Sequence, residues 1–219
     1  MNDQHEVLLV EWERRHFQKK YKAFIRDGII DPTLWAKAEP KVLFVLKESY
    51  GGPKDLREEI RHPGCAKWPI WWKAAYWCYA CHYVFSGKEL PPFPADDHAF
   101  KEASDLFLSS AVINVKKSNG QNPSNDDDLA RYVREDADLI RRQIDLIKPD
   151  IVISGNVWWA EELWPNARPL YDLVWRMDDR LLVNFWHPSW YQPDNKLFYY
   201  TLGSLLTTAI GRTRVVAAA

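Results

Sequence analysis

The stretch Lys41–Leu46 reads KVLFVL and runs directly into the polar, glycine-rich loop KESYGGP. A short apolar run that ends in such a loop is typical of a strand buried on both faces of a sheet. Three further runs of this kind follow in the chain: SSAVINV (109–115), PDIVISG (149–155) and LLVNFW (181–186). The sequence therefore predicts a sheet with four strands.

Segments with helical patterns lie before, between and after these runs. Charged residues alternate with apolar ones at helical spacing, Pro69 suits a first helical turn, and Asn125 or an aspartate beside it can cap the long helix that follows. The predicted helices cover residues 5–26, 66–85, 96–108, 127–147 and 195–210. Alternation of strands and helices predicts an α/β fold, a three-layer α/β/α arrangement around a central four-stranded, mostly parallel sheet. We expect one domain over residues 1–219, with a helical N-terminal extension (1–38) and an α/β core (40–212).

Composition excludes some classes of protein. The 219 residues carry a formal net charge of -1, which argues against a uniformly basic surface but permits a local basic groove for a polyanion. The charged, amphipathic N-terminus is unlike a secretory signal, and the aromatic-rich run 68–85 contains Lys73 and His82, so we expect neither a leader nor a membrane span. The chain is predicted to be cytoplasmic, without an obligatory protein partner.

The chain has three cysteines, Cys65, Cys78 and Cys81. The motif CYAC beside His82 resembles part of a zinc site, but a structural site needs a fourth ligand and a less apolar setting. Inert, reduced, buried thiols are the preferred interpretation. We therefore predict no metal and no cofactor.

Polar residues follow each predicted strand. In a parallel sheet the carboxyl ends of the strands meet at one edge, where ligands bind in a crevice. The residues that follow the four runs are Glu48 and Tyr50, Asn114 with Lys116 and Lys117, Gly155 with Asn156, and His187 to Ser189. This set suits chemistry better than packing.

The order of these motifs resembles the uracil-DNA glycosylase superfamily over roughly residues 40–205. The segment from INVKKSNGQNP to IKPDIVISGN is similar to the middle section of that family, and HPSW (187–190) is similar to its His-Pro-Ser loop, which lies in the DNA minor groove. The first motif departs from the family: LKESY (46–50) stands where many members carry GQDPY or GEAPG. In the first of these alignments Glu48 takes the place of the water-positioning aspartate and Tyr50 that of the aromatic wall of the base pocket. In the second, Lys47 would replace the acidic residue and leave no general base.

The resemblance implies an enzyme that flips a uracil or a modified pyrimidine out of DNA and hydrolyses its N-glycosidic bond, leaving an abasic site. It would be a monofunctional DNA glycosylase, acting in base-excision repair or in antiviral defence against modified phage DNA. Glu48 would stabilise positive charge on the sugar and orient water, His187 would donate a hydrogen bond to the base, and Asn114 would read the pyrimidine edge.

Further residues would hold the DNA. Tyr50, Trp68 or Trp71 could stack on the extruded base, and Trp190 or Tyr191 could fill the gap that it leaves. Lys116, Lys117 and Ser189 would contact phosphates. Each residue also has a plainer interpretation: Glu48 could cap a helix or meet an arginine, His187 could be structural, Asn114 could form a turn, the lysines could be solvated, and the tryptophans at 68–77 could fill the core.

Two other functions stay open. A non-catalytic DNA-binding module of the same fold would keep the DNA contacts without hydrolysis. A doubly wound hydrolase of small nucleotides is disfavoured because the sequence lacks a phosphate-cradling glycine loop.

Overall fold

The computed structural model describes residues 3–21, 23–52, 54–65, 68–93, 96–121, 123–190 and 194–217. Its described strands form one mixed sheet, in the order β1-β3-β2-β4-β7-β6-β5. The strands are β1 (Gly28–Ile29), β2 (Val42–Leu46), β3 (Ala111–Asn114), β4 (Ile151–Gly155), β5 (Arg168–Tyr171), β6 (Val174–Met177) and β7 (Arg180–Phe185).

The prediction of four strands is correct only for the centre of the sheet. The adjacent strands β3, β2, β4 and β7 are parallel, and they are the four apolar runs identified in the sequence. Three antiparallel strands extend the sheet: β1 pairs with β3, while β6 pairs with β7 and β5 with β6. These strands lack a continuous apolar run, because they lie toward the edges and are short or partly exposed.

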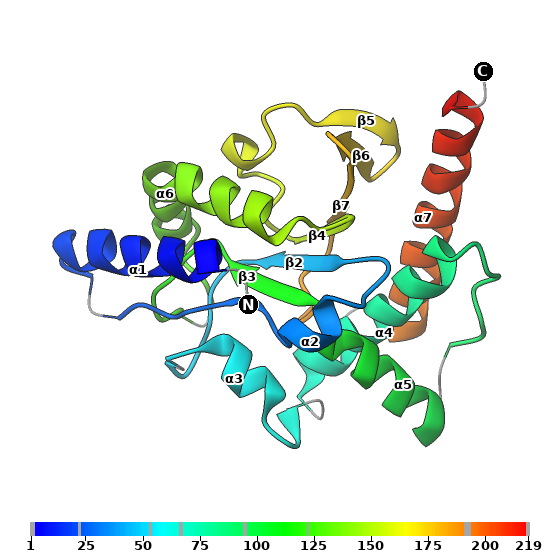
Figure 1. Cartoon of the computed structure of the whole chain (residues 1–219), viewed down its shortest axis with the longest axis horizontal. Coiled ribbons are helices and arrows are strands. Elements are labelled where there is room, and N and C mark those ends of the chain that lie inside the picture. Colours follow the sequence, from blue (N-terminus) through cyan, green and yellow to red (C-terminus); the bar gives the residue numbers. More distant parts are fainter. Residues whose placement is uncertain are drawn as a thin grey trace.

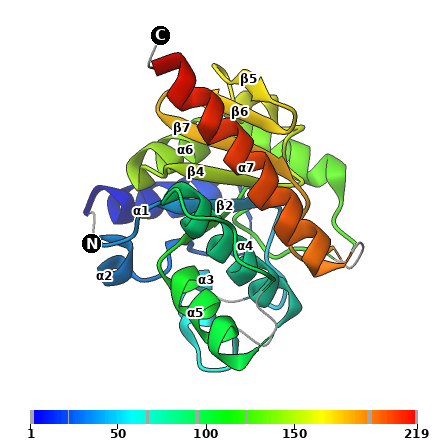
Figure 2. The ribbon, with the colours of Figure 1, turned by 90° about the vertical axis from the view of Figure 1, so that its right-hand side faces the viewer.

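Helices cover both faces of the sheet (Figure 1). Buried side chains of α1 (Asp3–Gln18) and α6 (Asp126–Ile147) pack on one face. The opposite face is covered by α3 (Leu56–Arg61), α4 (Pro69–Phe85), α5 (Asp97–Leu108) and α7 (Asn195–Ala217), and α7 crosses in front of the sheet in Figure 2. The expected three layers are therefore present.

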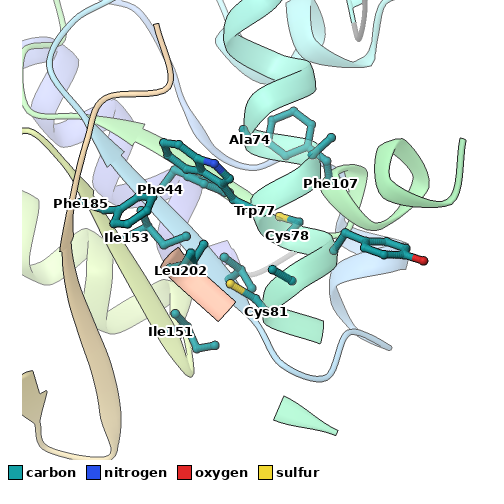
Figure 3. Close-up of a cluster of buried hydrophobic side chains, with 14 of the residues drawn as sticks. Phe44, Ala74, Trp77, Cys78, Cys81, Phe107, Ile151, Ile153, Phe185 and Leu202 are labelled. Carbon is teal, nitrogen blue, oxygen red and sulfur yellow. The ribbon is translucent and has the colours of Figure 1, made fainter. Parts of the chain in front are cut away.

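The larger core lies between the sheet and α4. Trp77 of α4 contacts Phe185 of β7 edge to face, with ring centroids 4.9 Å apart, and Figure 3 shows Cys78 and Cys81 in the same apolar cluster. All three cysteines are free and buried, and burial raises the pKa of the Cys78 and Cys81 thiols. Among the described residues, no group of three or more His, Cys, Asp or Glu side chains is arranged to hold a metal ion.

The first helix is shorter than predicted. The segment 5–26 was expected to be one helix, but α1 ends at Gln18 and Lys20 adopts a positive φ of 64°. The chain then runs extended, and Ile25 donates a backbone hydrogen bond to Lys117 (2.7 Å) while its side chain enters the core. The N-terminal segment is thus not only a helical extension, because β1 also adds a strand beside β3.

The remaining helices agree better with the sequence. Asp96 caps α5, and Asn125 caps α6 by accepting a hydrogen bond from the backbone N–H of Asp128 (2.9 Å). The short helices α2 (Pro32–Trp35) and η2 (Glu161–Leu163), like α3, were not predicted. Within the described part of the chain, none of the helices has the length and apolar character that crossing a bilayer requires.

Candidate functional site

The four parallel strands end at one edge of the sheet. The register pairs Leu46 with Asn114 and Gly155 with Phe185, so the loops that follow these strands all begin at the same level. The chain passes from β2 to β3 on one side and later to β4 on the other, so the strand order reverses at β2, which is where open α/β sheets bind ligands. A Cβ atom on Gly155 would lie 2.5 Å from Leu46 and 3.5 Å from Pro188, which shows how closely β4 packs against the loop after β7.

Glu48 lies at this edge but is covered by protein. Its side chain is 1% exposed, one carboxylate oxygen accepts a hydrogen bond from Lys116 (2.8 Å), and the other accepts one from the backbone N–H of Gln121 (3.2 Å). A Cβ on Gly120 would lie 2.6 Å from the Glu48 side chain, so the lack of a side chain at position 120 makes room for this carboxylate. The carboxylate of Glu48 is therefore held in one orientation by its partners.

Lys116 is an internal ion-pair partner. The prediction that it contacts a DNA phosphate conflicts with its position, because its side chain is 5% exposed and its ammonium lies between Glu48 and Asp128 (2.7 Å). Burial alone would lower the pKa of Lys116, but hydrogen bonds and charges from Asp128 and Glu48 raise it above its usual value. Lys116 thus stays protonated between the two carboxylates.

Lys117 is also wrongly predicted as a phosphate contact. Its ammonium is buried against both carboxylate oxygens of Asp27 (2.7 and 2.8 Å), donates to Gln143 (2.9 Å), and lies 4.7 Å from the centre of the Trp12 ring. The side chain of Lys117 was expected to face solvent. Instead its ammonium packs against Trp12 of α1. Asp27, which the sequence did not single out, is the centre of this polar cluster.

Asn114 is the last residue of β3 and is buried. Its backbone N–H donates to Asp27 (2.9 Å), which fixes the end of the strand. Pairing with Leu46 places Asn114 beside the strand that leads to Glu48. These two predicted catalytic residues therefore belong to neighbouring strand ends.

His187 lies two residues beyond the end of β7 and is partly buried. The backbone N–H of Ser189 donates to Nδ1 of the imidazole (3.2 Å), and the Ser189 hydroxyl lies 2.7 Å from the same atom. Because a backbone N–H can only donate, Nδ1 is an acceptor here and the neutral ring carries its proton on Nε2. Burial, together with the positive charge of Lys47, lowers the pKa of His187 to about 4, so the ring is neutral at physiological pH.

The catalytic candidates share an edge without forming a contact network. Strand β4 lies between β2 and β7, which places the two outer strands about 10 Å apart. The positive charge of Lys47, the residue before Glu48, helps to lower the pKa of His187. Glu48, Asn114 and His187 therefore lie at or just beyond strand ends on one edge of the sheet, and their convergence on a common site stays a prediction.

The predicted base-stacking residues divide into exposed and buried ones. Tyr50 (47% exposed) and Trp68 (50% exposed) present their rings to solvent, and the Tyr50 hydroxyl lies 3.1 Å from that of Ser124. Trp71 is wrongly predicted, because it is buried and stacks on Phe107 in the core.

The loop after His187 is attached to the start of α4. Ser189 and Trp190 are exposed, as a DNA contact requires, and the buried Lys73 of α4 donates a hydrogen bond to the carbonyl of Trp190. This contact ties the HPSW loop to the first turns of the helix that Trp68 precedes. Tyr191, the other candidate for filling the gap in the DNA, lies outside the described residues.

Sequence reasoning missed a pocket at the ends of β4 and β7. A cavity of about 180 Å³ is lined by Asn156, Leu173, Asn184, Phe185 and Trp186. Asn156 is one of the strand-end residues identified in the sequence, but no role was predicted for it. Leu173 had no such signal, because it lies in the turn between β5 and β6, and neither strand was predicted.

Fold and site together define an α/β protein with a fixed carboxylate, a neutral imidazole and exposed aromatic rings at the carboxyl edge of a parallel sheet. No family model matches the chain, and searches of curated proteins and of solved structures find no significant relative.

Proposed function

We propose that the protein is a DNA glycosylase, a divergent member of the uracil-DNA glycosylase superfamily that acts in the cytoplasm. The observation that carries the proposal is the state of His187, a neutral imidazole with its proton on Nε2 and its other nitrogen engaged by Ser189. Such a ring can donate a hydrogen bond to an oxygen on which negative charge develops. A departing pyrimidine has such an oxygen, because negative charge builds up on its carbonyl groups as the glycosidic bond breaks.

Glu48 would supply the complementary charge. When the N-glycosidic bond breaks, its electron pair goes to the base and positive charge develops on the sugar. A buried carboxylate stabilises this charge more strongly than a solvated one, since the local dielectric constant is low. Water then bonds to the anomeric carbon through its oxygen and gives up a proton, which the departed base anion finally takes, leaving an abasic site and the free neutral base. Because Lys116 holds Glu48 in place, we assign Glu48 electrostatic stabilisation first and orientation of water second.

The remaining roles follow from position. Asn114 would read the edge of the extruded base, and Tyr50 or Trp68 would stack on it, since both rings are available. Trp190 would enter the space that the base vacates. Lys116 and Lys117 have no part in binding phosphate, so the exposed Ser189 and backbone amides of these loops would make such contacts.

Base release from defined oligonucleotides tests the proposal. Purified protein is incubated with single- and double-stranded DNA containing uracil, hypoxanthine, 5-hydroxymethylcytosine or its glucosylated form, and alkali then cleaves abasic sites. We expect cleavage at one of these bases, and a loss of about 100-fold or more in rate for Glu48→Gln and for His187→Asn. Glu161→Gln, which alters an exposed carboxylate on η2, serves as the matched control and should keep the full rate.

The identity of the released base also separates the two biological roles. Release of uracil or hypoxanthine supports DNA repair, whereas release of a hydroxymethylated or glucosylated cytosine supports defence against modified phage DNA. Absence of abasic sites with every substrate contradicts the glycosylase.

One observation favours the alternative, a non-catalytic DNA-binding module of the same fold. Both carboxylate oxygens of Glu48 already have protein partners, and its side chain is almost completely covered. DNA retention that is insensitive to Glu48→Gln, without any abasic product, would support this function instead.

A further inference from the structure

We propose that the cavity between the ends of β4 and β7 is a second base-binding pocket, which holds the unpaired base next to the extruded nucleotide. The inference rests on the proposed function and adds a substrate class to it: DNA that is single-stranded around the target base. The cavity has a volume of about 180 Å³ and is lined by Asn156, Leu173, Asn184, Phe185 and Trp186.

The backbone around this pocket is held by hydrogen bonds between separate elements. Asn156 has a positive φ of 57°, and its N–H lies within hydrogen-bond distance of two carbonyls, those of Ser154 and Phe185 (2.9 Å each). The N–H of Asn184 donates to the carbonyl of Leu173 (2.9 Å), which ties β7 to the turn between β5 and β6. The pocket is therefore preformed, as ligand sites usually are.

The lining has the chemistry that a nucleobase needs. Asn156 and Asn184 each contribute a side-chain amide, with donors and an acceptor, and neither amide has a hydrogen-bond partner among the described residues. Trp186 is partly exposed, and its ring is supported by Phe198 at 5.2 Å between centroids. Two free amides beside an available aromatic ring favour a flat ligand with a polar edge.

Size limits the ligand to one base. Pockets for drug-sized molecules usually have volumes of about 300–1,000 Å³, so a cavity of about 180 Å³ suits a single heterocycle and excludes a base pair. Because amides read a base through its hydrogen-bonding edge, that edge must be free of a pairing partner. A duplex would have to open at this position.

The position of the pocket relates it to the proposed catalytic centre. Trp186 directly precedes His187, and Asn156 directly follows Gly155, which packs toward Pro188. A base in this pocket is therefore adjacent to the nucleotide whose base His187 would contact. The two bases would be neighbours on one strand, bound on either side of the His-Pro corner.

Binding of an unmodified oligonucleotide tests the pocket without relying on catalysis. The probe is a ten-nucleotide oligothymidylate, and the signal is quenching of tryptophan fluorescence, with the same oligonucleotide annealed to its complement as the comparison. We expect the single strand to bind at least tenfold more tightly than the duplex. Asn156→Gly and Asn184→Ala should each weaken its binding about tenfold, a loss typical of one good base contact.

Controls keep a loss of binding separate from a loss of folding. Glycine at position 156 retains the positive φ while removing the amide. Asn166→Gly removes an amide from an exposed turn outside the pocket and should bind like the wild type. Thermal melting must show that each variant is folded. Unchanged oligothymidylate affinity in folded Asn156→Gly and Asn184→Ala, or equal affinity for single strand and duplex, overturns the inference.

The outcome is distinguishable from failure of the proposed function. If abasic sites form normally but the two variants bind oligothymidylate as tightly as the wild type does, the glycosylase stands and the second pocket is wrong. If no substrate yields abasic sites but the variants lose affinity for the oligonucleotide, the pocket stands and the glycosylase is wrong.

Discussion

At the scale of single residues, the protonation of His187 links folding to pH. The imidazole has a pKa of 6.5 when unperturbed and of about 4 in the fold. Between these values the unfolded chain binds more protons than the folded chain. The contribution of His187 to stability is therefore complete above pH 6.5 and is lost as the pH falls toward 4.

The first prediction follows from this difference. Between pH 7 and pH 5 the melting temperature of the wild type should fall by about 2–4 °C more than that of His187→Asn, as followed by circular dichroism. Burial also lowers the pKa of His5, His16 and His82, so only the difference between the two curves isolates His187. Parallel curves would show that His187 is not held neutral. The exposed His98 provides the control substitution, His98→Asn, which should follow the wild type.

The second prediction concerns Lys117. Lys117→Met leaves Asp27 as an uncompensated buried charge, so we expect a loss of about 3–5 kcal/mol in the free energy of unfolding, measured with urea. Adding Asp27→Asn removes the remaining charge and should restore part of the loss. A phosphate-binding lysine would instead weaken DNA binding and leave stability within about 0.5 kcal/mol.

The sequence predicted the positions of the central strand ends better than the partners of the residues around them. Asn114 ends β3, and Glu48 and His187 follow β2 and β7, so the parallel order of these strands puts all three residues at one edge. That Lys116 and Lys117 are buried depends on Asp27, Asp128 and α1, which reach them from distant parts of the chain. No local pattern indicates such pairs, because an exposed lysine and a buried one look the same in sequence.

At the scale of secondary-structure elements, Gly155 controls the approach of β4 to its neighbours. The third prediction is that Gly155→Ala destabilises the fold by about 1–3 kcal/mol, since its new methyl group would overlap Leu46. It should also lower any excision activity by moving Pro188 and with it His187. Urea denaturation and the base-release assay measure the two effects. Gly211→Ala, on α7 with open space around it, is the matched control and should not be destabilised.

The fourth prediction concerns the start of α6. Asn125→Ala removes the side chain that accepts a hydrogen bond from Asp128, and it should cost about 1 kcal/mol of stability in urea denaturation. Asn125→Ser keeps a capping oxygen and should recover most of that loss. Equal effects of the two substitutions would show that the cap is not the cause.

The sequence predicted well the elements that carry a long apolar run or a clear helix cap. The four central strands, α4, α5 and α6 agree with the expected segments because burial on both faces, or a capped amphipathic pattern, leaves a clear signal. The edge strands β1, β5 and β6 were missed because their pairing depends on neighbours already in the sheet. The predicted first helix reached residue 26, whereas α1 ends at Gln18. Burial of Phe24 and Ile25 in the core overrides the helical pattern of this segment.

At the scale of the whole molecule, the net charge gives no general attraction for a polyanion. The net charge is -1, and both lysines expected to contact phosphates are neutralised inside the protein. The fifth prediction is that oligothymidylate binding depends weakly on salt, with a slope of log affinity against log salt no steeper than about -2. Titrations between 50 and 200 mM salt measure it, and a slope near -4 or steeper would show a phosphate-binding surface.

The contact of Trp12 with Asp136 and Lys117 has a consequence for dissecting the chain. The indole of Trp12 covers the buried Asp27–Lys117 ion pair. Asp27 in turn accepts a hydrogen bond from the backbone N–H of Asn114. Trimming the chain to begin at residue 40 would delete both Asp27 and Trp12. The ammonium of Lys117 would then lose its carboxylate partner and the ring that covers it. The minimal autonomous unit therefore starts at the first helix and not at the first central strand.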